Sequence, residues 1–288
     1  MTLPLAEAAP VLERLRPRVL FSDVDGTLVG RRASLLADLD GRPTLVAASA
    51  LVAAHTAGLE IVLVSGRTRA QLQESGRLLG VRDAVAELGT VLVVDGGAEL
   101  EWGRVPRALG PTPAEVLRRS GALDLVLAAF EGRLEFHTPW HEGRQGTALL
   151  RGLVDLEQAR ALLRGEGFDW ADLVDNGRLR GAYPRLGLAA GEAHTYHLAP
   201  AGVTKGSAAA RYLRLRGIGR EEAAAVGDSA ADLELDAAVG AMFLVGNAGP
   251  EARAAAGPDT VVAAGRAGEG WAEVVAALLA RMEAGGAA

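Results

Sequence analysis

Continuous apolar runs that each end in polar residues recur in both halves of the chain, with helical stretches between them. The clearest runs are "RVLFSDVD" (18–25), "LEIVLVSGR" (59–67), "AAAVGDS" (223–229) and "AMFLVGNA" (241–248). The segments around 44–57, 68–79 and 205–217 have the composition of helices. Strands that are apolar along their whole length, separated by helices, predict an α/β fold with a parallel sheet covered on both faces. Ligands bind such sheets at the carboxyl ends of the strands.

The middle of the chain has another pattern. A strand pair at 87–102 is followed by a helix at 112–130 with strand-like runs at 133–139 and 146–155, then by a helix at 155–165 with strand-like runs at 168–175 and 178–184. Within this region, "DNG" at 175–177 predicts a tight hairpin turn, because Asn-Gly suits positive backbone dihedrals. The order helix, strand, strand, given twice, predicts an inserted α+β module. We therefore expect residues 1–102 and 191–288 to form the core domain and residues 103–190 the insertion.

Charge and composition exclude several classes of function. The net charge is −6, and no basic stretch is long enough to follow a nucleic-acid backbone or an anionic membrane. The absence of cysteine excludes disulfides, zinc fingers and thiol catalysis. The N-terminus lacks the basic head of a signal peptide, and no apolar run approaches the roughly 18 residues of a membrane span. We expect a cytoplasmic protein, monomeric or homodimeric, with no nucleic-acid or membrane partner.

Paired acids end the first apolar run. Asp23 and Asp25 are one residue apart in an extended segment, which places them on the same side. Two carboxylates at a strand end can divide the work of a nucleophile or metal ligand and of an acid or base. Asp and Gly also form ordinary turns, so a turn is the alternative. The apolar run before the pair favours a functional site.

Three further polar patches lie at predicted strand ends or helix starts. Ser65 and Gly66 meet the start of the next helix, where a hydroxyl and free amides can bind an anion, although Ser is also a common N-cap. Lys205 is the single lysine beside 29 arginines, and a compact ammonium there can neutralise a phosphate oxygen. Asp228 and Asp232 are one helical turn apart and offer the hard oxygen ligands that magnesium prefers, or simply an acidic helix start.

In this order the patches D-x-D-G-T, Ser-Gly, Lys and Gly-Asp-x-x-x-Asp resemble the four motifs of the haloacid dehalogenase superfamily of phosphohydrolases. The resemblance covers most of the chain. It implies a Rossmann-like core with a type C2 cap inserted between the second and third motifs. The helix, strand, strand repeat resembles the C2B form of that cap. "PAGVTKGSA", "VGNAGPEARAAA" and "GEGWAEVV" are similar to the Cof-type group.

The resemblance implies a role for each matching residue. Asp23 would be the nucleophile that forms an aspartyl phosphate, and Asp25 the general acid and base. Magnesium would be bound by Asp23, the carbonyl of Asp25 and Asp228, with Asp232 supporting the metal or orienting Lys205. The phosphoryl group would be held by a set of polar residues, namely Ser65, Gly66, Lys205, Thr27 and Asn247.

Two positions depart from the family pattern. Many C2-capped members have Glu-Asn-Gly after the second motif, whereas this chain has Leu88 between Glu87 and Gly89. Ala231 replaces an Asn that often precedes the last aspartate of the fourth motif. Neither change removes a primary catalytic group, but both weaken assignment to one subfamily.

The expected function is a Mg²⁺-dependent phosphatase acting on a small phosphorylated metabolite, most simply a sugar phosphate. Alternatives are a phosphomannomutase-type phosphomutase, a mannosyl-3-phosphoglycerate, sucrose-phosphate or phosphoglycolate phosphatase, or an idle ligand-binding module, which would have no need of Asp25. Cap residues that could set specificity are Arg133, His137, Trp140, His141, Arg144 and Arg180. His137 and His141 do not read as a metal pair, because Pro139 interrupts a helix between them. His194 and His197 are expected to be structural.

Overall fold

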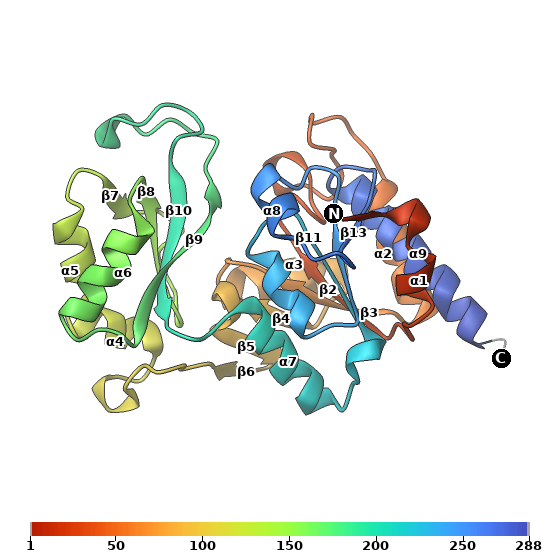
Figure 1. The fold of residues 1–288 in the computed structure, drawn as a ribbon, viewed down its shortest axis with the longest axis horizontal. Coiled ribbons are helices and arrows are strands. Elements are labelled where there is room, and N and C mark those ends of the chain that lie inside the picture. Colours follow the sequence, from red (N-terminus) through yellow and green to blue (C-terminus); the bar gives the residue numbers. More distant parts are fainter. Residues whose placement is uncertain (1, 287–288) are drawn as a thin grey trace.

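The computed structural model describes residues 2–286 and contains two sheets in two domains (Figure 1). The core domain has a nine-stranded sheet in the order β1-β13-β12-β11-β2-β3-β4-β5-β6. Its strands pair in parallel from β1 to β4, while β5 and β6 continue it as an antiparallel hairpin. The strands are β1 (Leu3–Pro4), β2 (Val19–Asp23), β3 (Glu60–Val64), β4 (Asp83–Ala86), β5 (Val91–Val94), β6 (Gly97–Leu100), β11 (Ala223–Gly227), β12 (Ala241–Leu244) and β13 (Val261–Val262).

Helices cover both faces of this sheet, as whole-length apolar strands require. One face packs against α1, α2, α3 and α9, and the other against α7, α8 and the three-ten helix Asp232–Ala237. The first group is α1 (Ala9–Leu12), α2 (Val46–Ala57), α3 (Arg69–Leu79) and α9 (Gly268–Gly286), and the second is α7 (Lys205–Arg216) and α8 (Pro250–Ala255). The predicted α/β core with a parallel sheet is confirmed.

Two helix starts face the carboxyl edge of the sheet, and both have a capping box. The Thr68 hydroxyl accepts a hydrogen bond from the Gln71 amide at the start of α3, and the Thr204 hydroxyl accepts one from the Ser207 amide at the start of α7. These side chains satisfy amide donors that have no partner inside the helix. The caps therefore fix where the first residues of α7, including Lys205, are placed.

The smaller domain, called the cap below, stands beside the core and is joined to it by two chain crossings (Figure 1). Its four antiparallel strands have the order β7-β8-β10-β9. Its elements are α4 (Pro113–Arg119), α5 (Ala122–Ala129), β7 (Leu134–Phe136), β8 (Ala148–Gly152), α6 (Leu156–Gly165), β9 (Ala171–Arg178) and β10 (His194–Pro200). The predicted order of helix, strand, strand given twice is present, with the first helix broken at Ser120 and Gly121. The last strand is misplaced in the prediction: it is β10 at His194–Pro200, and residues 179–184 form no strand.

Alternation along the cap strands separates its two faces. Leu150, Leu173, Tyr196 and Leu198 pack in the cap's own apolar cluster with the helices. Residues one position away, such as His197 on β10, point to the opposite face, because successive side chains of a strand alternate. That face is turned to the core.

Two further predictions for the cap are wrong in detail. The boundary at residue 190 is too early, because β10 pairs with β8 and β9 and so belongs to the cap sheet. The "DNG" segment makes no hairpin: β9 runs through it, with Gly177 at φ 98° and its amide donating to Asp175 Oδ1. A register shift opposite Tyr196 absorbs the irregularity, so the Asn-Gly signal marks a bulge.

Within residues 2–286, no helix is both long enough and apolar enough to cross a membrane.

Candidate active site

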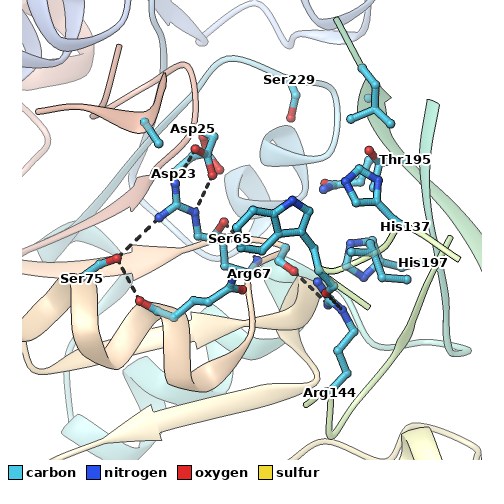
Figure 2. Close-up of a pocket in the computed structure, with 18 of the residues that line it drawn as sticks. Asp23, Asp25, Ser65, Arg67, Ser75, His137, Arg144, Thr195, His197 and Ser229 are labelled. Atoms are coloured by element: carbon cyan, nitrogen blue, oxygen red, sulfur yellow. Dashed lines mark hydrogen bonds and ion pairs between the residues drawn. The ribbon is translucent and has the colours of Figure 1, made fainter. Parts of the chain in front are cut away.

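A cavity lies between the carboxyl edge of the core sheet and the strand face of the cap (Figure 2). On the core side it is lined by residues that follow β2, β3 and β11 and by the start of α7. The core residues include Asp23, Asp25, Ser65, Gly66, Arg67, Lys205 and Asp228, together with residues of α3, and the cap residues include His137, Trp140, Arg144, Asn176, Thr195 and His197. Polar patches that lie up to about 200 residues apart in the sequence, such as those at Asp23 and Asp228, thus line one cavity.

Lys205 lies at the centre of the acidic group. Its ammonium donates to Asp232 Oδ1 at 2.6 Å and to Asp23 Oδ1 at 3.4 Å, and all three residues are buried. Burial alone would lower the pKa of Lys205, but the two carboxylates raise it above its ordinary value. The lysine therefore stays charged, and its position beside Asp23 suits it to neutralise an anion bound there.

Asp232 is fully occupied by other protein groups. Its Oδ2 accepts from the amides of Asp228 and Ser229, at 3.1 and 3.0 Å, and from the Ser229 hydroxyl at 2.7 Å. Burial opposes its ionisation, yet Lys205 holds the pKa of Asp232 below its ordinary value. This geometry fits a residue that orients Lys205 and the loop after β11, one of the two predicted roles.

Asp23 and Asp228 have the opposite electrostatic balance. Burial, followed by the charge of Asp232, raises the pKa of Asp23 well above its ordinary value and that of Asp228 to about 7. One carboxylate oxygen each from Asp23, Asp228 and Asp232 lies within 4.8 Å of the others. Gly26 makes room for this group, since a Cβ there would lie 2.4 Å from Asp228 Oδ2. The buried Asp23 and the partly buried Asp228 lack full compensation of their charge, and together they form a hard oxygen set that fits a divalent cation.

Asp25 is held in an ion pair that the sequence did not indicate. Arg67 donates to both of its carboxylate oxygens, at 2.7 and 2.6 Å, as the dashed lines in Figure 2 show. The Asp25 side chain is 52% exposed, so it remains open to the cavity. Arg67 directly follows Ser65 and Gly66, and the strand-end rule could have identified it.

Ser65 and Thr27 differ in what they already contact. Ser65 is buried, and its hydroxyl accepts from the Arg67 amide at 3.3 Å. The Thr27 hydroxyl is buried and has no hydrogen-bond partner among residues 2–286. Thr27 does not line the cavity in the described part of the chain, so the structure does not place it at the predicted phosphate contact. Gly66 lies where the cap meets the core: a Cβ there would be 2.7 Å from Asn176 Nδ2 and 3.1 Å from His197 Nε2.

Asn247 is used within the core. Its amide nitrogen donates to the Gly26 carbonyl at 2.9 Å and to Asp228 Oδ2 at 3.3 Å, and its oxygen accepts from the Ala267 amide at 2.6 Å. Asn247 does not line the cavity in the described part of the chain. Its contacts suit it to position Asp228 and the loop after β2, in place of the predicted phosphate contact.

Glu87 has a role that sequence reasoning missed. Its carboxylate is completely buried and accepts from the amides of Gln145, Gly146 and Thr147, each at 3.0 Å, and from the Thr147 hydroxyl at 3.1 Å. Thr147 in turn lies 3.0 Å from His197 Nδ1. A carboxylate of the core domain thus binds residues 145–147 of the cap, the segment directly before β8. Glu87 follows β4, so its place at a strand end was the available signal.

The cap residues proposed from sequence fall into two groups. His137, Trp140 and Arg144 line the cavity, whereas Arg133, His141 and Arg180 do not. Arg133 lies over the Phe130 ring and His141 packs on Phe136. His197, expected to be structural, lines the cavity from within β10.

Comparison with known proteins finds hydrolases and phosphatases. A family model of haloacid dehalogenase-like hydrolases matches residues 180–263. A phosphoglycolate phosphatase of Pyrobaculum aerophilum is 31% identical over 264 residues, covering 91% of this chain and 96% of that protein. One from Methanoculleus marisnigri is 28% identical, covering 80% and 85%.

Among solved structures, sucrose-phosphatase from Synechocystis matches with a TM-score of 0.65 and 16% identity, covering 92% of this chain and 98% of that one. A haloacid dehalogenase-like hydrolase from Bacteroides thetaiotaomicron matches with a TM-score of 0.61 and 16% identity, covering 90% and 98%. At this identity the likeness shows a shared fold.

Proposed function

The chain belongs to the haloacid dehalogenase-like hydrolases and is a phosphatase, and on this premise we propose that it is a magnesium-dependent phosphohydrolase of sugar phosphates that works through an aspartyl phosphate. The observation that carries the proposal is the buried Asp23, which lies beside Lys205 at the floor of the cavity under the cap. A nucleophile next to a fixed cation is the arrangement that phosphoryl transfer requires.

In the first step, an oxygen of Asp23 attacks phosphorus and the bond to the leaving alkoxide breaks. Lys205 neutralises charge on the phosphoryl oxygens, and Ser65 offers its hydroxyl to them. Asp25 is open to the cavity and lies two residues after Asp23; it enters this step protonated, with its ion pair to Arg67 broken, and gives its proton to the leaving oxygen. In the second step, Asp25 takes a proton from water, which attacks the phosphoaspartyl group and frees phosphate.

The carboxylates of Asp23 and Asp228 would hold magnesium, with the Asp25 carbonyl as a further ligand. When bound, the ion neutralises these acids and withdraws charge from the phosphoryl group. Asp232 and Asn247 position Lys205 and Asp228 through the hydrogen bonds described above. Lys205 and Asp228 are thus held in position by Asp232 and Asn247 before substrate binds.

Phosphoglycolate is a second candidate substrate, because the curated relatives of similar length carry the name phosphoglycolate phosphatase. Arg32 and Arg178 also line the cavity and could meet its carboxylate. The retained acid/base residue Asp25 argues against an idle binding module. A phosphomutase would retain a bisphosphate intermediate in place of releasing phosphate.

The direct test is hydrolysis of an aryl phosphate with and without magnesium, followed by a panel of sugar phosphates, phosphoglycerate conjugates and phosphoglycolate. We expect Asp23→Asn to lower kcat by at least about a thousandfold with its fold intact. Asp124→Asn, an exposed aspartate on the outer side of the cap, is the matched control and should retain full activity. Full activity in Asp23→Asn would disprove the mechanism.

A further inference from the structure

Trp140 is an exposed aromatic side chain that lines the cavity. It is 54% exposed, while Trp271, Phe21 and Phe243 are completely buried. Within residues 2–286 it is the only Trp, Tyr or Phe that lines the cavity. A single exposed apolar residue needs no special explanation on an open surface. Inside a cavity it supplies the apolar contact area that binding sites for small molecules use.

A buried arginine fixes the loop that carries Trp140. Arg144 Nε donates to the Trp140 carbonyl at 3.1 Å, and its Nη1 donates to the Gly66 carbonyl at 3.0 Å. The Arg144 side chain is only 4% exposed and lies 3.8 Å from the Glu87 carboxylate. One guanidinium therefore ties the Trp140 backbone to the core loop that follows Ser65. A loop backbone held in place before a ligand binds loses less conformational entropy on binding.

Several polar groups that line the same cavity as Trp140 carry no charge. Asn176 and Thr195 line the cavity from β9 and β10. His137 also lines it, and its Nδ1 is buried without a partner in the described part of the chain. Burial, with Arg151 and Arg144 nearby, lowers the pKa of His137 to about 4. The imidazole is therefore neutral near pH 7 and can exchange hydrogen bonds with a hydroxyl.

A cavity lined by both an aromatic face and neutral donors and acceptors matches a ring with an apolar C–H face and a hydroxyl edge. We propose that Trp140 is a specificity-determining residue, on which the sugar ring of a cyclic sugar phosphate stacks while its phosphate lies at Asp23. This inference rests on the proposed function. It selects ring-containing substrates over phosphoglycolate, which has no ring to stack.

The test compares a hexose phosphate with phosphoglycolate in the wild-type protein, Trp140→Ala, Trp140→Phe and Trp102→Ala. We expect Trp140→Ala to lower kcat/KM for the hexose phosphate about tenfold, mainly through KM, because one aromatic contact is lost. Its kcat/KM for phosphoglycolate should stay within about twofold, since that ester makes no stacking contact. Trp140→Phe should recover part of the loss. Trp102 lies outside the cavity, so Trp102→Ala should behave as wild type.

Binding without turnover gives an independent readout. In an Asp23→Asn background, a hexose phosphate should change the indole fluorescence, and Trp140→Phe in that background should remove the change. Equal effects of Trp140→Ala on both esters, no effect on either, or an unchanged fluorescence response would overturn the inference while leaving the phosphatase intact. A wild-type protein that hydrolyses none of the esters would instead overturn the proposed function, and the fluorescence titration would still decide the role of Trp140.

Discussion

Single carboxylates in this site differ sharply in what compensates their charge. Asp232 has Lys205 and three further donors, whereas Asp228 has the Asn247 amide at 3.3 Å beside its oxygen. Asp232 is therefore left with a low pKa although it is completely buried, whereas burial raises the pKa of the less deeply buried Asp228, which has fewer donors. Two acids four positions apart thus serve different purposes: one organises the protein, and the other is left for a ligand.

The raised pKa of Asp228 predicts a pH-dependent response to magnesium. Its folded-state pKa of about 7 lies above the ordinary value of 3.8, so this group makes the metal-free protein less stable as pH rises from about 4 to about 7. Magnesium binds the ionised form, so it should raise Tm more at pH 8 than at pH 6. Thermal unfolding in EDTA at several pH values measures the stability of the metal-free protein, and the same experiment in Mg²⁺ measures the rise in Tm. In Asp228→Asn the magnesium increment should largely disappear, and an undiminished increment would place the cation elsewhere.

At the scale of elements, the connection between core and cap depends on Glu87. Its carboxylate accepts the amides of three consecutive residues that lead into β8. Glu87→Gln replaces one acceptor oxygen with an amide donor that faces these N–H groups. We expect the free energy of unfolding to fall by about 2 kcal/mol, the scale of hydrogen bonds to a buried charge. Urea unfolding measures the loss.

Glu157→Gln on α6 is the control for this substitution, because that side chain is 77% exposed and pairs only at the surface. It should change stability by less than about 0.5 kcal/mol. Equal stability losses in the two variants would argue that Glu87 does not anchor the cap.

The sequence could predict which elements carry the site, for a physical reason. Buried parallel strands are apolar throughout, so their ends are visible as polar residues, and Asp23, Ser65 and Asp228 were found by this rule. The same signal was available for Glu87 after β4, whose contacts with the cap involve residues 58 to 60 positions later. Such long-range pairing leaves no local pattern. The boundary of β10 was missed for a similar reason, since its pairing with β8 depends on the cap being assembled.

At the scale of the whole molecule, the apolar side chains form separate cores. Two clusters cover the faces of the large sheet, and a third lies between the cap helices and the cap strands. The hydrogen bonds that join the two domains at the cavity run from the Arg144 guanidinium to the Gly66 carbonyl and from the Gly146 amide to the Glu87 carboxylate. Polar contacts between independently packed domains permit relative motion more readily than a shared apolar core does. The arrangement suits a cap that must admit substrate and then exclude water.

Removing the Arg144 contact should loosen the cap without unfolding it. In Arg144→Met, amide hydrogen exchange should become faster in the loops at 65–67 and 137–147, because the guanidinium no longer joins them. Exchange in β8 and β10 should stay as in wild type, since their pairing and apolar cluster are retained. Arg180→Met, an exposed arginine outside the cavity, is the control. Faster exchange throughout the cap would mean that Arg144 stabilises the fold of the domain, and unchanged exchange in both loops would mean that the domains are held by other contacts.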